Sequence, residues 1–151
     1  MKNAVKWILC IYVAFVFIQS LFFKFTDAYE TIHIFSTLGA WAGFEWFADY
    51  GAYGVGTVEL IAAIMLFFAS SRLYGAAIAS GVMMGAVFFH LFTPLGIAMP
   101  EFDEMGNVTG DDGGLLFYNA CGVLVASLIV TAMEFFGTDN AVKRILFRTS
   151  Q

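Results

Sequence analysis

The chain has 151 residues, of which 60% are hydrophobic and 13% are charged, and its formal net charge is −5. Because soluble domains average roughly 45–50% apolar and about 25% charged residues, a water-soluble fold of this length could not bury so much apolar surface. The composition excludes a soluble globular enzyme and a disordered chain. The acidic balance excludes a nucleic-acid-binding protein, which needs a basic face. We therefore expect an integral membrane protein with a single membrane domain over residues 1–151.

Four apolar runs are long enough to cross a bilayer, whose core needs roughly 20 apolar residues as helix. They cover about residues 7–25, 53–69, 73–92 and 115–136. Their polarity does not alternate as it does in the strands of a membrane β-barrel. No small-residue cleavage site follows the first run, which we interpret as an uncleaved anchor. The predicted fold class is all-α, an integral membrane four-helix bundle.

If the chain crosses the membrane four times, nearly all the basic residues that flank these runs lie on the same side of the membrane. They precede the first run, separate the second from the third and follow the fourth: Lys2, Lys6, Arg72, Lys143, Arg144 and Arg148. The other two loops are acidic, and Lys24 is the only basic residue near them. Because positive charge marks the cytoplasmic side, both termini are predicted to be cytoplasmic and the outer face acidic.

A short amphipathic helix is predicted in the first outer loop, residues 26–52. Asp27 followed by Glu30 resembles a capping box, and Gly39 can end the helix. Between these signals hydrophobic residues recur at helical spacing: Tyr29, Ile32, Phe35 and Leu38. We expect this helix to lie on the outer surface or to cap the bundle. A loop that merely connects two spans is the alternative.

The second outer loop, residues 93–114, is acidic and rich in turn-forming residues between positions 101 and 112. Its carboxylates do not follow the spacing of an EF-hand calcium loop. We expect a solvated acidic loop, with calcium binding as the alternative.

The third run contains Gly81 and Gly85, a small-xxx-small pair that permits two helices to approach closely in lipid. We expect an internal helix contact here, with a dimer face as the alternative. Either interpretation requires a neighbouring backbone close to both glycines.

Six polar residues are predicted to share the outer half of the bundle. A charge buried in a span costs at least ~2.5–3.5 kcal/mol, so each one needs a partner or a function. A helical rise of about 1.5 Å per residue brings these residues to similar outer levels: Gln19, Lys24, Glu59, His90, Asn119 and, at the outer mouth, Asp112. They predict a partly dry polar pocket opening outward. Such a pocket suits a carbonyl, a quinone or lipid head group, or a small anion.

Lys24 can reach Glu59 if their helices adjoin, and an ion pair would offset much of the desolvation of Glu59. The alternative is a purely structural staple, with Lys24 and His90 extending to water near the helix ends. Nothing comparable is expected in the inner half. There Glu134 is expected to pair with Lys143 or Arg144 or simply to meet water.

No metal and no covalently bound cofactor is predicted. Cys10 and Cys121 fall in opposite halves of the bundle, about 15 Å apart in depth, which is too far for a disulfide. His33 and His90 have no further ligands at metal-binding or haem-binding spacing.

Several segments resemble the DoxX family of small bacterial and archaeal membrane proteins. The resemblance extends over about residues 8–135 and rests on segments around the polar positions: 19–26, 34–39, 56–61, 88–91 and 112–117. It implies a four-helix bundle in the bacterial inner membrane and a redox setting, linked to a quinol oxidase and to thiosulfate:quinone oxidoreductase activity. Lys24, Glu59 and His90 then become candidates for a quinone-contacting or structural cluster.

These observations favour an accessory subunit of a redox or quinone-linked membrane complex rather than an enzyme acting alone. Its partners would be the lipid bilayer and other membrane proteins of that complex, with quinone as the cofactor expected in the pocket. The alternative is a scaffold that docks another membrane complex. A small ion or lipid transporter is less favoured, because the polar cluster has no counterpart in the inner half to complete a pathway.

Overall fold

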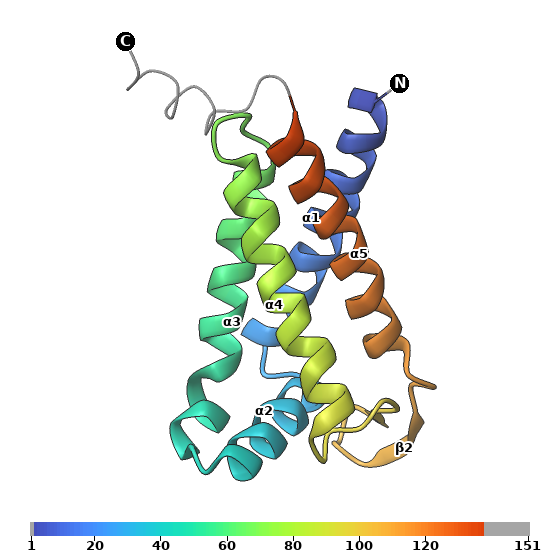
Figure 1. The fold of residues 1–151 in the computed structure, drawn as a ribbon. Coiled ribbons are helices and arrows are strands. Elements are labelled where there is room, and N and C mark those ends of the chain that lie inside the picture. The colour runs from blue at the N-terminus through green and yellow to red at the C-terminus, as the bar shows by residue number, and fades with distance from the viewer. Residues whose placement is uncertain (1, 138–151) are drawn as a thin grey trace.

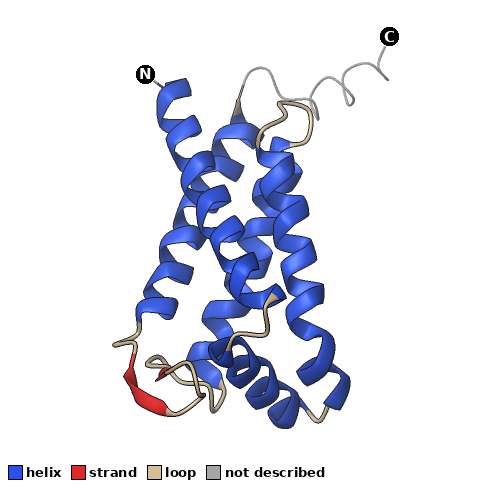
Figure 2. Ribbon diagram, turned by 180° about the vertical axis from the view of Figure 1, so that it is seen from behind, coloured by secondary structure: helices blue, strands red, loops and turns tan. Residues whose placement is uncertain are grey.

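The computed structural model describes residues 2–137. Within this range the chain is mostly helical (Figure 1). In chain order its elements are α1 (Lys2–Phe25), α2 (Tyr29–Ala42), α3 (Glu45–Leu66), α4 (Arg72–Phe92), β1 (Pro100–Phe102), β2 (Val108–Asp111) and α5 (Leu115–Phe136). The four longer helices run side by side, while α2 and the two strands lie together at one end (Figure 2).

Three helices in the described range are long and apolar enough to cross a membrane: α1, α4 and α5. The four-span count is therefore not confirmed, because the predicted span 53–69 corresponds to the later part of α3 and the turn after it, and α3 is not among these three helices. This helix begins eight positions before the predicted start and carries Glu45, Asp49 and Glu59. Its acidic residues and glycines lower its apolar character, although it is as long as the others.

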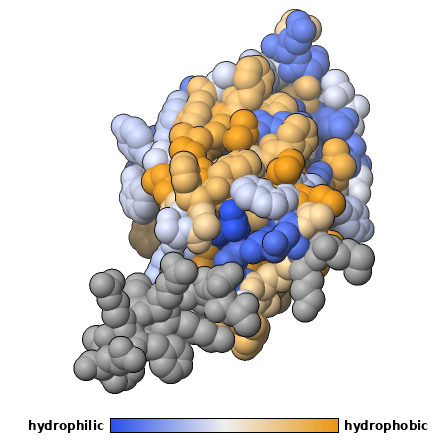
Figure 3. All heavy atoms as spheres, turned by 90° about the horizontal axis from the view of Figure 1, so that it is seen from above, coloured by the Kyte–Doolittle hydropathy of each residue, from blue (hydrophilic) through white to orange (hydrophobic). Residues whose placement is uncertain are grey.

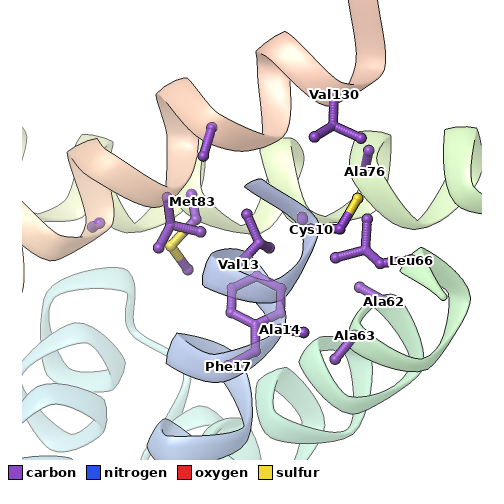
Figure 4. Packing of buried hydrophobic residues seen from close by; sticks show 14 residues of the cluster. Cys10, Val13, Ala14, Phe17, Ala62, Ala63, Leu66, Ala76, Met83 and Val130 are labelled. Carbon is purple, nitrogen blue, oxygen red and sulfur yellow. The ribbon is translucent and has the colours of Figure 1, made fainter. Parts of the chain in front are cut away.

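The long helices form a closed ring, in which α1 packs against α3 and α5, and α4 packs against the same two neighbours. The main core fills the half of the ring nearest the start of α1 and consists mostly of small residues (Figure 4). Phe17, Leu66 and Val130 are among the few large side chains that are fully buried there. Small residues let the four helices approach closely at this end, as is usual in membrane bundles.

The glycines of α4 differ in what surrounds them. A methyl group at Gly75 would lie 2.8 Å from Cβ of Met65 and 2.9 Å from the carbonyl oxygen of Ala62, so this glycine permits the close approach of α3. A methyl group at Gly81 or Gly85 would meet nothing within 4 Å. The predicted internal contact at the small-xxx-small pair is therefore wrong, because no described backbone lies against it.

The amphipathic helix expected in the first outer loop is present as α2, but its ends differ from the prediction. It continues past Gly39 to Gly43, which adopts the left-handed conformation that ends it. No side chain caps its start, and Asp27 accepts a hydrogen bond of 2.8 Å from the Tyr53 hydroxyl instead. Gly39 lies within the helix, where a Cβ atom would come within 3.0 Å of the backbone nitrogen of Ala48 in α3.

The acidic loop contains a β-hairpin, so the all-α fold class is wrong in this segment. Strands β1 and β2 pair antiparallel. Asp103 organises the turn between them, because its carboxylate accepts hydrogen bonds from the backbone N–H groups of Met105 and Asn107. Bonds from the Asn107 side chain and backbone hold the pKa of Asp103 below its ordinary value. The strands are too short and too exposed to leave a periodic hydrophobic signal.

The opposite end of the bundle holds an ionic cluster that the sequence analysis did not anticipate. Glu134 accepts Lys6 Nζ at 2.9 Å and a guanidinium nitrogen of Arg72 at 3.3 Å. The Arg72 guanidinium lies 4.5 Å from the centre of the Trp7 ring, and its Nε donates to the Leu66 carbonyl. Figure 3 views this end and shows hydrophilic residues among hydrophobic ones. The predicted basic partners in the C-terminal segment, Lys143 and Arg144, lie outside the described residues, as does Arg148.

Candidate functional site

A cavity of about 460 Å³ lies within the ring of helices, on the side of the core that faces α2. All five helices contribute to its lining. Phe17, Met83 and Ala120 belong both to its wall and to the main core, so they close it toward the start of α1. A second cluster, centred on Leu38 and Leu95, closes it on the side of α2. The cavity wall is mostly apolar, with a few polar side chains among its lining residues.

The deepest of these polar groups is the carboxylate of Glu59, whose side chain is 3% exposed. Its Oε2 accepts a hydrogen bond from Lys24 Nζ at 2.8 Å and one from the Ser20 hydroxyl at 2.9 Å. Lys24 also donates to the Ser20 oxygen at 3.0 Å, which joins α1 and α3 in a three-residue network. The ion pair expected from the sequence is therefore present, and it neutralises a charge that would be costly at this depth.

His90 lies at the end of α4 and is 7% exposed. Its Nδ1 lies 2.6 Å from the carbonyl oxygen of Gly96. Because a carbonyl oxygen only accepts, Nδ1 carries the proton, and a neutral imidazole then presents Nε2 as an acceptor. Within residues 2–137, Nε2 makes no hydrogen bond. His90 lines the same cavity as Lys24 and Glu59.

The other three residues predicted for the pocket are Asn119, Gln19 and Asp112, and only Asn119 lines the cavity. Asn119 lines the cavity, although its amide nitrogen donates to the Leu115 carbonyl one turn earlier on α5. Gln19 is exposed on α1 and does not line the cavity. Depth alone predicted its position, whereas the helical phase of α1 turns Ser20 inward and Gln19 outward.

Asp112 does not line the cavity either, but it fixes the loop next to it. Its carboxylate accepts hydrogen bonds from the backbone N–H groups of Met99, Gly114 and Leu116. Burial raises the pKa of Asp112, but these bonds, together with the positive charge that His90 can carry, outweigh burial and hold the pKa below its ordinary value. Asp112 therefore joins the start of α5 to the segment after α4. It fixes the position of this loop and does not itself line the cavity.

The arrangement offers both hydrogen-bond donors and acceptors inside an apolar space. Two of the three Lys24 ammonium protons are used by Ser20 and Glu59, which leaves the third available. Oε1 of Glu59 and Nε2 of His90 accept no hydrogen bond from any described residue. No group of three or more potential metal ligands occurs in the described part of the chain. The site can therefore hold an uncharged molecule with a carbonyl or hydroxyl group and an apolar body.

Three residues that line this cavity were not predicted to belong to it: Ser20, Gly81 and Gly85. Ser20 lies one helical turn before Lys24, so the i, i+4 spacing of two polar residues on a membrane helix was the available signal. Gly81 and Gly85 line the cavity rather than a helix contact. Nothing in the sequence distinguishes a glycine that faces a cavity from one that permits close packing.

The fold and this site define a helical membrane protein with a largely apolar internal cavity that carries a buried Lys–Glu pair. The chain belongs to the MauE family, because residues 2–95, more than half of its length, match the family described as methylamine utilisation protein MauE. This match covers α1 to α4 and includes Lys24, Glu59 and His90. No curated protein and no solved structure matches the chain.

The resemblance to the DoxX family is wrong, because the family that matches is a different one. Ionisable residues in membrane helices generally face the bundle interior and pair with one another. A Lys, a Glu and a His near one end of three helices can therefore occur in unrelated small membrane bundles. These residues therefore do not distinguish one such family from another.

Proposed function

We propose that this protein is an accessory membrane subunit of a redox system that serves methylamine utilisation, and that its cavity binds a membrane-soluble quinone. The description of the family as a methylamine utilisation protein supports the metabolic setting. The single observation that supports ligand binding is the cavity of about 460 Å³ around the buried pair of Lys24 and Glu59. In this proposal the protein holds the quinone for a partner and performs no chemistry alone.

The polar groups of the cavity match the two states of a quinone. The third proton of Lys24 can be donated to a quinone carbonyl, and Nε2 of His90 or Oε1 of Glu59 can accept from a quinol hydroxyl. The ion pair of Lys24 and Glu59 has no net charge, which favours an uncharged ligand over an anion. Val16, Ile34 and Phe89 supply apolar wall for the ring and the start of its tail.

Four membrane crossings and cytoplasmic termini in the bacterial inner membrane belong to the same proposal. Lys6 and Arg72 lie at the end of the bundle opposite to the acidic hairpin and the start of α3. Because basic residues favour the cytoplasmic side, the cavity then lies in the outer half of the membrane. A partner that delivers or receives electrons outside the membrane would meet it there.

Extraction of the purified protein tests the binding proposal. The wild type, isolated in mild detergent from a host that makes quinones, is expected to retain quinone that chromatography and mass spectrometry detect. The Lys24→Gln/Glu59→Gln variant removes both charges and so keeps the net charge of the site at zero. It is expected to retain about tenfold less quinone, because the ammonium donor and the carboxylate are gone. The control, Lys6→Gln/Glu134→Gln, removes the Lys6–Glu134 pair at the other end together with the contact of Glu134 to Arg72, and it is expected to retain quinone as the wild type does.

Two results would contradict the proposal. One is the absence of quinone from the wild type. The other is equal retention by the two double variants. If redox partners co-purify with the wild type while quinone does not, the protein is a scaffold instead.

A further inference from the structure

Two glycines on α4 lie where the packing of the protein does not require them. Gly81 and Gly85 both line the cavity, and a methyl group at either position would meet nothing within 4 Å. Gly75 of the same helix, in contrast, is closely contacted by α3. Glycine is the least favourable residue other than proline in a helix interior. A glycine facing open space therefore weakens α4 without any compensating contact within the described protein.

The position of the two glycines connects the polar groups to the surface. Gly81 is exposed and Gly85 is half-buried, so the strip that they form runs from the cavity wall to the outside of the bundle. By helical rise, Gly81 lies about 13 Å from the first residue of α4 and Glu59 about 10 Å from the last residue of α3. The two helices meet at these ends through the turn that joins them. Gly81 is thus close in depth to the carboxylate of Glu59.

The same cavity contains polar side chains that are more than nine-tenths buried. Glu59 is 2% exposed and His90 is 7% exposed. Each keeps an acceptor atom, Oε1 and Nε2, without a hydrogen bond to any described residue. Both atoms are accessible rather than sealed in the protein, so a ligand in the cavity that they line can donate a hydrogen bond to them.

We propose that Gly81 and Gly85 form the surface on which the ligand ring lies, and that these residues set the size of the ring that can enter. The ligand is a planar, uncharged, membrane-soluble carbonyl compound of the quinone class, and this inference rests on the proposed function. The spacing of the two glycines along the helix, about 6 Å, matches the width of a six-membered ring with its oxygens. Bare backbone lets the flat ring approach α4 while a carbonyl oxygen turns toward Lys24. The exposed end of the strip admits the ring from the bilayer.

A neighbouring membrane helix is the competing occupant, since small-xxx-small pairs also join helices. The cavity lining favours the ring, because Val82 and Ala86, which follow the two glycines in sequence, line the cavity as well. The two glycines therefore lie where the cavity wall meets the exposed face of α4.

Substitutions of graded size separate these possibilities. We would measure the binding of decylubiquinone to the full-length protein in detergent, together with Tm and the mass of the particle, for Gly81→Ala, Gly81→Leu, Gly85→Ala and Gly85→Leu. Binding is expected to weaken a few-fold for alanine and by at least about tenfold for leucine. Tm is expected to stay unchanged or to rise for the alanine variants, because the new methyl group meets nothing. The matched control is Gly54→Leu, since Gly54 is equally open but does not line the cavity.

The outcomes are distinct. Decylubiquinone binding that is unchanged in the Gly81 and Gly85 variants would overturn this inference and leave the proposed function standing. A smaller particle mass in those variants with unchanged binding would assign the strip to helix pairing and would also overturn it. If the wild type binds no decylubiquinone, both the inference and the quinone assignment fail.

Discussion

Glu59 is the residue on which the site depends most, because its carboxylate is almost fully enclosed by protein. Lys24 and Ser20 approach the same oxygen, Oε2, at 2.8 and 2.9 Å. The other oxygen, Oε1, accepts no hydrogen bond from a described residue. One oxygen of the carboxylate therefore joins α1 to α3, while Oε1 takes no part in this contact.

Removing one member of this pair is expected to cost more than removing both. Glu59→Gln leaves the Lys24 ammonium without its carboxylate, and Lys24→Gln does the reverse. Each single change should reduce the free energy of unfolding by about 1–3 kcal/mol, since a buried charge loses its partner. Thermal unfolding in detergent measures this effect.

The double variant Lys24→Gln/Glu59→Gln should be more stable than either single variant, because it leaves no unpaired charge. Additive losses would show that the two side chains do not interact. They would contradict the geometry described above.

Asp112 gives the protein a predictable response to acid. Because its pKa is held below the ordinary value, its contribution to stability is present above the unfolded pKa of about 4 and is lost as the pH falls through the lower folded value. Asp112→Ala should cost about 1–3 kcal/mol at neutral pH, because three backbone N–H groups lose their acceptor. Melting curves from neutral pH down to about pH 3 should show a smaller decline for Asp112→Asn than for the wild type. An equal decline would assign the acid sensitivity to other groups.

The sequence was sufficient to predict a residue's place in the site only where a buried charge needed a partner. Glu59 needed a cation, and Lys24 was the only basic residue at that end. Gln19 was wrongly included because a neutral amide at a given depth can face either way. Ser20 was missed because the one hydroxyl proton of a serine on a membrane helix can instead be donated to a carbonyl of its own helix, and here the Phe17 carbonyl oxygen lies 2.8 Å from Ser20 Oγ.

At the scale of elements, α2 and the turn between α3 and α4 define the two ends of the ring. The periodicity of the first outer loop was sufficient to predict α2, because its buried Phe35 and Leu38 follow helical spacing. Its capping was not predictable, since Asp27 is taken by Tyr53 from a helix distant in sequence. The hairpin was missed because strands of three and four residues provide no recognisable alternation.

The junction of α3 and α4 is expected to depend on Gly75. Gly75→Ala places a methyl group 2.8 Å from Cβ of Met65. The helices must then separate, at a cost of about 1–3 kcal/mol. Gly54→Ala is the matched control, because its methyl group meets nothing, and it should leave Tm unchanged or slightly raised. Equal Tm values for Gly75→Ala and Gly54→Ala would contradict the prediction.

At the scale of the whole molecule, the ring has a tightly packed half and a hollow half. The Lys6, Arg72 and Glu134 cluster lies in the first, and the Lys24 and Glu59 pair lies in the second. The apolar composition was enough to predict a helical membrane bundle. The cavity was not predictable, because it arises from small side chains on α4 combined with a cap formed by α2. Neither feature has a signature of its own.

Labelling of single cysteines tests the membrane topology. In a background with Cys10 and Cys121 replaced by alanine, Asp49→Cys and Glu104→Cys are expected to react with a membrane-impermeant maleimide from outside intact spheroplasts. Ser70→Cys, in the turn after α3, is expected to react only after lysis, because positive charges retain that turn in the cytoplasm. Labelling of positions 49 and 70 from the same side would mean that α3 does not cross the membrane.

The most direct test of the cavity as a quinone site is photolabelling with an azido-ubiquinone, followed by peptide mapping. The label is expected on residues 81–90 of α4 and 16–24 of α1, and it should be lost from both in Lys24→Gln/Glu59→Gln. Residues 125–129 of α5, which include the outward-facing Val125, Leu128 and Ile129, should carry little label. Equal labelling of 81–90 and 125–129, unchanged by the double substitution, would show that the quinone merely dissolves in the surrounding lipid and that the cavity does not bind it.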